Sequence, residues 1–304
     1  MQSIDVHIHT NTNCNLKCRH CYVDANSCKT ETINGEFLIK LITYLCDNFD
    51  TDIHLEGGEI FLEEHLICSL LKLSDPAKKT ITITSNGLIR TEYEDTLEAL
   101  RSVSCLRISV EGHTEYMHRK IRNCSLRTVL DNAAYYKKHG INVVLRMTLN
   151  AFNVGSIFSG VIPSLKKEGF DNFQLYEMQP VGRGNGSDLC IEGTLEFLYN
   201  DWVSHPTHVN TSISLPGRRI EEVKRYSSDL KRIGVRIERV GNAASISISP
   251  SREIKICPWD MTSAQGMIID ENNFETVVDI IKGQTVPHRC DFCSKIVLRE
   301  GAQC

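Results

Sequence analysis

Short runs of β-branched residues alternate with longer helical patterns from residue 4 to about residue 180, and this alternation limits the fold more than any other feature of the chain. It is typical of βα units, in which right-handed helical crossovers join parallel strands. The predicted strands are Ile4–His9, Asp52–Leu55, Thr80–Thr84, Leu106–Val110, Asn142–Leu149 and Phe173–Met178. Six such units close about three-quarters of an eight-stranded barrel, so we predict a partial (β/α)6 barrel of the TIM type.

Helical patterns fill the gaps between these strands. They are predicted at Gly35–Asn48, Leu62–Leu73, Glu92–Ser102, Ser125–His139 and Ile157–Glu168. In the first of them Leu38, Leu41, Ile42 and Leu45 have the spacing of a helix face that packs on a core. The barrel core is predicted to span residues 1–185, and residues 186–304 form a smaller C-terminal domain.

Three cysteines follow the first predicted strand, in the string Cys14-Asn-Leu-Lys-Cys18-Arg-His-Cys21. Thiolates this close together on one loop can bind a single soft metal centre. A structural zinc site needs four ligands, whereas a [4Fe–4S] cluster held by three cysteines leaves one iron open. The residues alone also allow a zinc knuckle completed by His20 or His7, and a disulfide framework.

Further polar motifs end or follow the next predicted strands. Gly57-Gly58-Glu59 comes after the second strand, Asn86 after the third, and Ser109 lies near the end of the fourth. Barrels of this type place their chemistry on the loops at the carboxyl ends of the strands. We therefore expect these motifs to meet the cysteine loop on one rim.

The cysteine string and the glycine motif together resemble the CxxxCxxC and GGE motifs of the radical S-adenosylmethionine (radical SAM) superfamily. The resemblance implies that Cys14, Cys18 and Cys21 hold a [4Fe–4S] cluster whose open iron binds S-adenosylmethionine (SAM). In that family an electron from the cluster cleaves SAM, and the resulting 5′-deoxyadenosyl radical abstracts a substrate hydrogen atom.

The resemblance also implies cofactor contacts. Gly57, Gly58 and Glu59 match the motif that holds the amino group of SAM, and Ser109 matches a serine that meets its ribose. Glycines allow close approach of the backbone to a ligand, and an amine needs an acceptor. The alternative for this motif is an ordinary glycine turn after a strand.

Two more residues are candidates for binding the same cofactor. Arg146 lies on the fifth predicted strand, where relatives place a cation near the SAM carboxylate, and burying it without an anion would be costly. Its alternative is a structural ion pair with Glu111 or Glu177. Asn86 is predicted to help orient the ligand, or else to serve as a turn residue.

A second group of cysteines lies near the C-terminus. An alternating hairpin pattern from residue 245 ends at Cys257, and Cys290, Cys293 and Cys304 follow. The arrangement resembles a reduced form of the SPASM or twitch extension of radical SAM proteins, which binds auxiliary [4Fe–4S] clusters. We therefore predict one auxiliary cluster on these four cysteines, with a four-cysteine zinc site as the alternative.

Cys124 and Cys190 are free thiols in predicted loops that overlook the barrel mouth. Relatives that invert an amino-acid α-carbon use a thiol to quench the substrate radical. The resemblance makes Cys124 and Cys190 candidate hydrogen donors, and the alternative is that they are bystanders.

Composition limits the partners and the cellular compartment that we expect for the chain. Its 304 residues are 41% hydrophobic and 24% charged, with a formal net charge of -4, and they contain no long basic run. We expect no nucleic-acid partner and no membrane span, since no apolar stretch approaches the roughly 18 residues a span requires. The N-terminus lacks the features of a signal peptide, so thirteen cysteines indicate metal ligands and buried thiols in a reducing cytoplasm.

The predicted function is radical SAM modification of a ribosomally made peptide by crosslinking, oxidation or epimerisation. The alternative is dehydrogenation or rearrangement of a small molecule such as a sugar alcohol or nucleotide. Its anionic group would meet Arg183, Arg218 or Arg219, although a solvated basic face is the alternative for the last two. A third reading is a metal-bearing binding module without catalysis. An electron donor such as flavodoxin or ferredoxin is an expected partner. Because only 13 residues precede Cys14, we expect a leader-binding module either to be missing or to be supplied by a separate protein.

Overall fold

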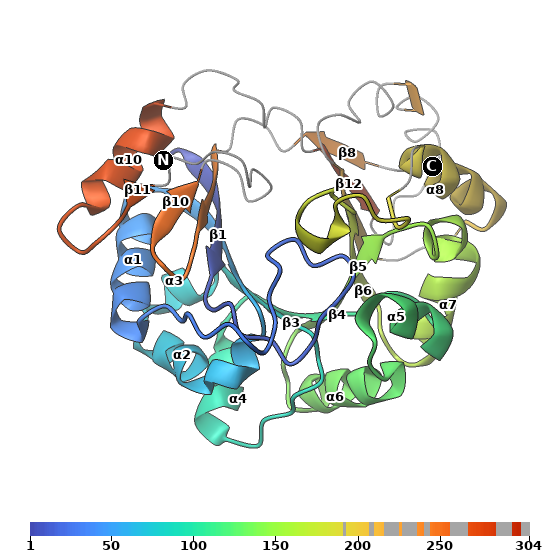
Figure 1. Cartoon of the computed structure of the whole chain (residues 1–304), viewed down its shortest axis with the longest axis horizontal. Helices are drawn as coiled ribbons and strands as arrows, with labels where there is room; N and C mark the ends of the chain where they lie inside the picture. The colour runs from blue at the N-terminus through green and yellow to red at the C-terminus, as the bar shows by residue number, and fades with distance from the viewer. Residues whose placement is uncertain are drawn as a thin grey trace.

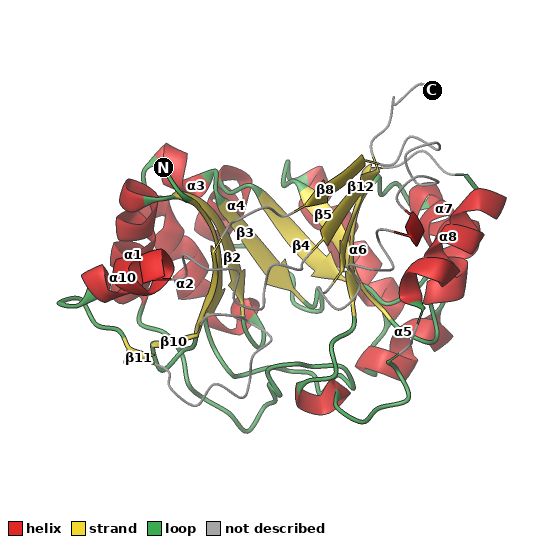
Figure 2. Ribbon diagram, turned by 90° about the horizontal axis from the view of Figure 1, so that it is seen from above, coloured by secondary structure: helices red, strands yellow, loops and turns green. Residues whose placement is uncertain are grey.

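The protein is described here by a computed structural model that covers residues 1–190, 193–206, 210–215, 225–226, 236–239, 244–255, 267–283 and 294–298. Within these ranges, twelve strands form one unclosed, curved sheet in the order β11-β10-β9-β1-β2-β3-β4-β5-β6-β7-β12-β8. The helices cover its convex side (Figures 1 and 2).

Six parallel strands make the middle of the sheet. They are β1 (Ser3–His9), β2 (Asp50–Glu56), β3 (Ile81–Ser85), β4 (Cys105–Ser109), β5 (Val143–Leu149) and β6 (Asn172–Glu177). Every boundary lies within two residues of its predicted position. The predicted partial (β/α)6 barrel is confirmed.

The helices of the described ranges include the predicted crossovers. They are α1 (Gly35–Asn48), α2 (Glu64–Ser69), α3 (Asp75–Lys78), α4 (Glu94–Ser102), α5 (Glu115–Arg122), α6 (Leu126–Lys138), α7 (Ile162–Lys167), α8 (Thr194–Ser204) and α10 (Phe274–Gly283). Helix α1 begins where its sequence indicates, because the Asn34 side chain accepts hydrogen bonds from the amides of Glu36 and Phe37.

Two predicted helices are less regular than expected. The stretch around Leu62–Leu73 divides into two 3₁₀ turns with α2 between them, and Ile157–Val161 forms a π-helical turn before α7. Helix α5 was not predicted, because it is only eight residues long and most of its residues are charged or polar.

Strands from the C-terminal part of the chain extend both edges of the sheet. Strand β9 (Ala244–Ile248) pairs in parallel with β1, and β10 (Glu253–Lys255) and β11 (Met267–Ile268) continue outward in antiparallel pairing. At the other edge, β7 (Asn210–Leu215) pairs in parallel with β6, followed by β12 (Ser294–Leu298) and β8 (Arg236–Arg239). The hairpin predicted from the 245–257 pattern is therefore present as β9 and β10.

The parallel strands are apolar on one face and polar on the other. Alternate residues such as Val6, Ile8, Ile53 and Leu55 belong to the main hydrophobic core. The intervening positions carry polar or charged side chains, which are His7, His9, His54, Glu56, Thr82, Thr84, Arg107, Ser109, Arg146, Thr148, Gln174 and Tyr176. Parallel sheets covered on both faces are usually apolar throughout, so the polar concave face identifies the side that holds the site.

Tyr136 on α6 fixes the loop that follows β3. Its side chain is fully buried, and its hydroxyl donates to the Ile89 carbonyl oxygen and accepts from the Thr91 amide, both at 3.1 Å. This loop begins at Asn86, so the phenol connects the hydrophobic core to the rim of the barrel.

We expect Tyr136→Phe to lower the free energy of unfolding by about 1–3 kcal/mol, because it leaves the buried Thr91 amide without its acceptor. Urea denaturation followed by circular dichroism measures the change. Tyr93→Phe is the matched control, since Tyr93 is 72% exposed, and it should change stability by less than about 0.5 kcal/mol. Equal stabilities for the two variants would contradict this role of Tyr136.

Candidate active site

The loop of residues 10–34 crosses the carboxyl ends of the strands and carries Cys14, Cys18 and Cys21 (Figure 1). Beneath it lies a cavity that opens into the concave side of the sheet. Its lining includes the three cysteines and Leu16, His20, Tyr22, Val23, Ala25, Glu56, Gly57, Gly58, Thr84, Ser85, Asn86, Ser109, Arg122, Arg146, Thr148, Tyr176, Glu177, Met178, Gln179 and Arg183. The motifs therefore lie together on one rim, as expected.

The glycine motif holds the backbone of the cysteine loop. The Gly58 and Glu59 amides donate to the carbonyl oxygens of Asn11 and Asn13, at 2.9 and 2.8 Å. A Cβ atom on Gly58 would lie 1.9 Å from the Asn13 oxygen, and Gly57 has a φ of +145°. The two glycines therefore leave room for the backbone of the cysteine loop.

Glu59 joins three segments of the rim. Its carboxylate accepts hydrogen bonds from the Asn86 amide at 2.7 Å, the Ser85 hydroxyl at 2.9 Å and the Phe61 amide at 3.1 Å. Burial raises the pKa of Glu59, and these donors oppose the rise. The side chain is fully buried and is not part of the cavity lining, so its role toward the SAM amine stays a prediction.

Arg183 holds the cysteine loop from the other side. Its Nε donates to the Cys18 carbonyl oxygen at 2.8 Å, and its Nη2 to that of Ala25 at 2.9 Å. Gly182 has a φ of +56°, and a Cβ there would lie 2.4 Å from the Tyr22 carbonyl oxygen. We expected Arg183 to meet an anionic group in the small-molecule alternative, but its guanidinium is already engaged by the cysteine loop.

Nitrogen donors surround two of the cysteine sulfurs. The Leu16 amide lies 3.4 Å and Asn86 Nδ2 3.9 Å from Cys14 Sγ, and Arg122 Nη1 lies 3.8 Å from Cys18 Sγ. Hydrogen bonds of this kind are typical around the thiolates of iron–sulfur clusters.

The three cysteine sulfurs do not form a compact ligand group. Within the described part of the chain, the group of three potential ligand atoms that all lie within 4.8 Å of one another is Asp5, His7 and His54. A tetrahedral zinc ion with 2.3 Å bonds needs sulfurs about 3.8 Å apart. As they lie, the three sulfurs are therefore not placed to bind one zinc ion together.

Arg146 forms an ion pair inside the cavity. Its Nη1 lies 2.9 Å from Glu56 Oε1, and its guanidinium lies over the Tyr176 ring. The alternative drawn from the sequence named Glu111 or Glu177 as its partner, whereas the structure shows Glu56. The other Glu56 oxygen accepts from the Tyr22 hydroxyl at 2.5 Å.

Asp5, His7 and His54 lie on the concave face toward the amino ends of the strands. Arg107 Nη1 lies 2.7 Å from His54 Nδ1, and because a guanidinium can only donate, that nitrogen must accept. His54 Nε2 then carries the proton and donates to Asp5 Oδ1 at 2.7 Å. With no lone pair left at Nε2, this group is a hydrogen-bonded network rather than a metal site.

His7 carries the positive charge of this network. Burial alone would lower the pKa of His7, but the carboxylates of Asp5 and Glu56 raise it to about 10. The imidazolium therefore links the floor of the barrel to Glu56 at the cavity.

Two further predicted cofactor contacts, Ser109 and Asn86, both lie at the cavity. Ser109 ends β4 and lines the cavity, as does Asn86, whose Oδ1 also accepts from the Leu88 amide in a turn. The contacts of Asn86 are thus compatible with a role in orienting the ligand and with a role as a turn residue.

Neither candidate hydrogen donor is part of the cavity lining. The Cys124 thiol is buried in the hydrophobic core, 3.2 Å from His118 Nε2, and Cys190 packs near Ile121 and Met178. Their role stays a prediction. Cys257, Cys290, Cys293 and Cys304 lie outside the described residues.

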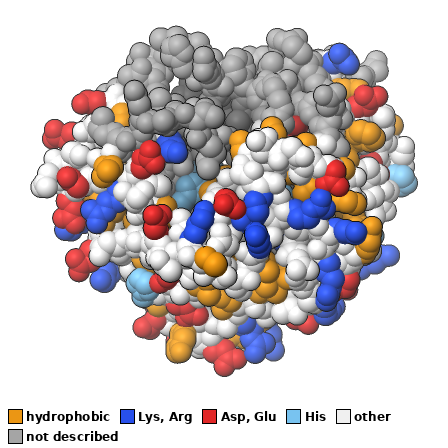
Figure 3. Space-filling view, viewed as in Figure 1, with side chains coloured by type: hydrophobic (Ala, Val, Ile, Leu, Met, Phe, Trp, Pro, Cys, Tyr) orange, Lys and Arg blue, Asp and Glu red, His pale blue; other side chains and the backbone are white. Residues whose placement is uncertain are grey.

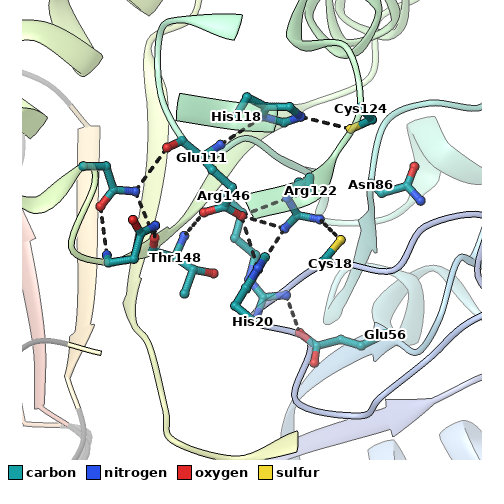
Figure 4. Close-up of polar contacts among 12 residues, drawn as sticks. Cys18, His20, Glu56, Asn86, Glu111, His118, Arg122, Cys124, Arg146 and Thr148 are labelled. Atoms are coloured by element: carbon teal, nitrogen blue, oxygen red, sulfur yellow. Dashed lines mark hydrogen bonds and ion pairs between the residues drawn. The ribbon is translucent and has the colours of Figure 1, made fainter. Parts of the chain in front are cut away.

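A buried ion pair beside the cysteines was missed from the sequence. Arg122 Nε lies 2.8 Å from Glu111 Oε1, and His20 Nε2 lies within 3.4 Å of both residues (Figure 4). Burial and the neighbouring Arg122 hold the pKa of His20 well below its usual range, so the ring is neutral. The sequence signal that could have revealed this pair is Arg122, an arginine in a charged segment shortly after the fourth strand.

The fold and the cysteine-bearing cavity define an enzyme of the radical SAM type. The family profile described as "Radical SAM superfamily" matches residues 8–152, which include the cysteine loop, the glycine motif and β2–β5. The match covers just under half of the chain and includes both sequence motifs, and members of this superfamily use a [4Fe–4S] cluster and SAM.

Similar proteins include two from Bacillus subtilis strain 168. The peptide biosynthesis protein YydG is 24% identical over 152 residues, covering 49% of this chain and 47% of YydG. The antilisterial bacteriocin subtilosin biosynthesis protein AlbA is 25% identical over 173 residues, covering 56% of this chain and 38% of AlbA. This chain thus spans less than half the length of either relative.

The fold also resembles that of Streptococcus suis SuiB. In the crystal structure of SuiB bound to the precursor peptide SuiA, the TM-score is 0.68 at 14% identity, covering 94% of this chain and 65% of SuiB. Another SuiB structure is bound to SAM. At this identity the likeness shows a common fold.

A membrane-spanning segment was not expected. In the ranges that the structure describes, no helix combines the length and the apolar character needed to cross a bilayer.

We expect Gly58→Ala to prevent normal assembly of the cysteine site, because its methyl group would collide with the Asn13 carbonyl oxygen. After anaerobic reconstitution the variant should hold less than half the iron of the parent protein. Gly155→Ala is the control, since a Cβ there has nothing within 4 Å. Iron content unchanged by Gly58→Ala would show that the close approach is not needed.

Proposed function

We propose that this radical SAM enzyme holds its cluster on Cys14, Cys18 and Cys21 and abstracts a hydrogen atom from a ribosomally made peptide, leading to a crosslink, an oxidation or an epimerisation. The observation that carries the proposal is the cysteine loop, held over a polar cavity by Gly58, Glu59 and Arg183. When bound, the cluster supplies one electron to SAM and so generates the 5′-deoxyadenosyl radical.

The residues of the chain have distinct roles in this proposal. Gly57, Gly58, Glu59 and Asn86 fix the rim to which the methionine part of SAM binds, and Ser109 lies where the ribose would reach β4. Arg146 reaches the same cavity, and its pairing with Glu56 holds the guanidinium in place for a carboxylate. The buried surroundings limit the access of water to the radical.

The relatives support a peptide substrate. YydG and AlbA are biosynthesis proteins for a peptide and a bacteriocin, and SuiB binds a precursor peptide. A small molecule such as a sugar alcohol or nucleotide is the alternative substrate.

Basic side chains near the cysteine loop support a partner that delivers electrons. Lys17, Arg19 and Lys120 are exposed there, and cationic groups gather near the middle of this face of the molecule (Figure 3). An acidic carrier such as flavodoxin or ferredoxin would complement them. A separate leader-binding protein and a cytoplasmic location complete this part of the proposal.

The C-terminal residues 186–304 are proposed to carry a second cluster on Cys257, Cys290, Cys293 and Cys304. The support is the number and type of these ligands. Cys124 or Cys190 would serve as the hydrogen donor if the peptide is epimerised.

The reductive cleavage of SAM tests the radical chemistry directly. Reconstituted protein incubated with SAM and dithionite should release 5′-deoxyadenosine, and Cys18→Ser should lower this release at least a hundredfold because the cluster loses a ligand. Cys28→Ser is the control, since Cys28 is an exposed thiol. Cluster-loaded protein that releases no 5′-deoxyadenosine would favour a binding module without catalysis.

Metal analysis tests the auxiliary site. In the Cys14/Cys18/Cys21→Ala variant, anaerobically purified protein should retain about four irons per chain if the four C-terminal cysteines hold a [4Fe–4S] cluster. One zinc ion and no iron would establish the four-cysteine zinc alternative instead.

A further inference from the structure

Arg122 occupies a buried position between the cysteine loop and β4. It is the last residue of α5, which ends because Asn123 adopts a left-handed conformation with a φ of 54°. The Arg122 side chain is 11% exposed, and it reaches Cys18 across the wall of the cavity (Figure 4).

Glu111 fixes the guanidinium in this position. Both Nε and Nη2 of Arg122 lie 2.8 Å from Glu111 Oε1, while Nη1 points to Cys18 Sγ at 3.8 Å. The second carboxylate oxygen accepts from the Thr148 amide at 3.1 Å, and Glu111 is completely buried. A cation and an anion are thus both held at a fixed distance from one cysteine sulfur.

Their environment strengthens the effect of these charges. Water is excluded on the Glu111 side, so the field of each charge is weakly screened. Leu16 and Asn86, which lie near Cys14 Sγ, are by contrast neutral donors. Arg122 brings a full positive charge to Cys18.

We propose that the Arg122–Glu111 pair sets the reduction potential of the cluster held by Cys14, Cys18 and Cys21. This inference rests on the proposed presence of that cluster. A reduced cluster has one more negative charge than the oxidised one, so an N–H donor and a cation at Cys18 stabilise the reduced form. The Glu111 carboxylate acts in the opposite direction, and the potential reflects the balance of the two.

We therefore expect substitutions of Arg122 and of Glu111 to shift the reduction potential in opposite directions. Arg122→Met removes the donor and the cation, and should lower the potential by about 59 mV, a tenfold change in the one-electron equilibrium constant. Glu111→Gln removes the opposing anion while keeping Arg122, and should raise the potential by a similar amount. The double variant should lie between the single variants.

Potentiometric titration of the full reconstituted protein, followed by the EPR signal of the reduced cluster, measures these shifts without any substrate. Arg119→Met is the matched control, because Arg119 lies on the same helix but is exposed and paired with Glu115. Its potential should equal that of the parent protein. Iron content per chain is measured for every variant.

The outcomes separate this inference from the proposed function. If the parent protein takes up no cluster, the proposed function fails first. If clusters form and both variants leave the potential unchanged, or shift it in the same direction, the tuning role is overturned. If Arg122→Met does not fold because Glu111 is left buried and unpaired, Glu111→Gln decides, since only a raised potential supports the inference.

Discussion

The close contact between two backbones underlies the arrangement of the whole site. Gly58 and Glu59 pair through their amides with Asn11 and Asn13, so the loop after β2 and the loop after β1 become one unit. Any side chain at residue 58 would push them apart. Glu59 then extends the unit to β3 through Ser85 and the Asn86 amide. The cysteine geometry thus depends on contacts made entirely within the chain.

A second constraint is the polarity of the concave face. Charged side chains are buried there, and two of the arginines form ion pairs with buried carboxylates, Arg146 with Glu56 and Arg122 with Glu111. Removing one member would leave the other charge buried and unpaired, which is strongly destabilising. The paired charges therefore fix side-chain positions around the cavity, and they give its walls an electrostatic field that an apolar barrel interior would lack.

The sequence was informative wherever structure follows from local pattern. The six strands, α1 and the β9–β10 hairpin have strong periodicity or clear end signals, and the motifs lie on one rim because parallel strands share a direction. The partner of Arg146 was wrong in the sequence-based alternative, because Glu56 and Arg146 meet across the concave face of a curved sheet. Helix α5, and Arg122 with it, was missed because eight residues with few apolar side chains give too short a pattern to recognise.

The two edges of the barrel are completed by residues far away along the chain. Ile4–Ile8 of β1 pair with Ala244–Ile248 of β9, and Asn172–Tyr176 of β6 pair with Asn210–Ser214 of β7. During synthesis the first strand is made long before its outer neighbour, so an open strand edge persists while more than 200 further residues are added. Such non-local pairing slows folding. A fragment ending at residue 185 would retain the cysteine loop, yet it would expose two unpaired edges that are prone to associate with other chains.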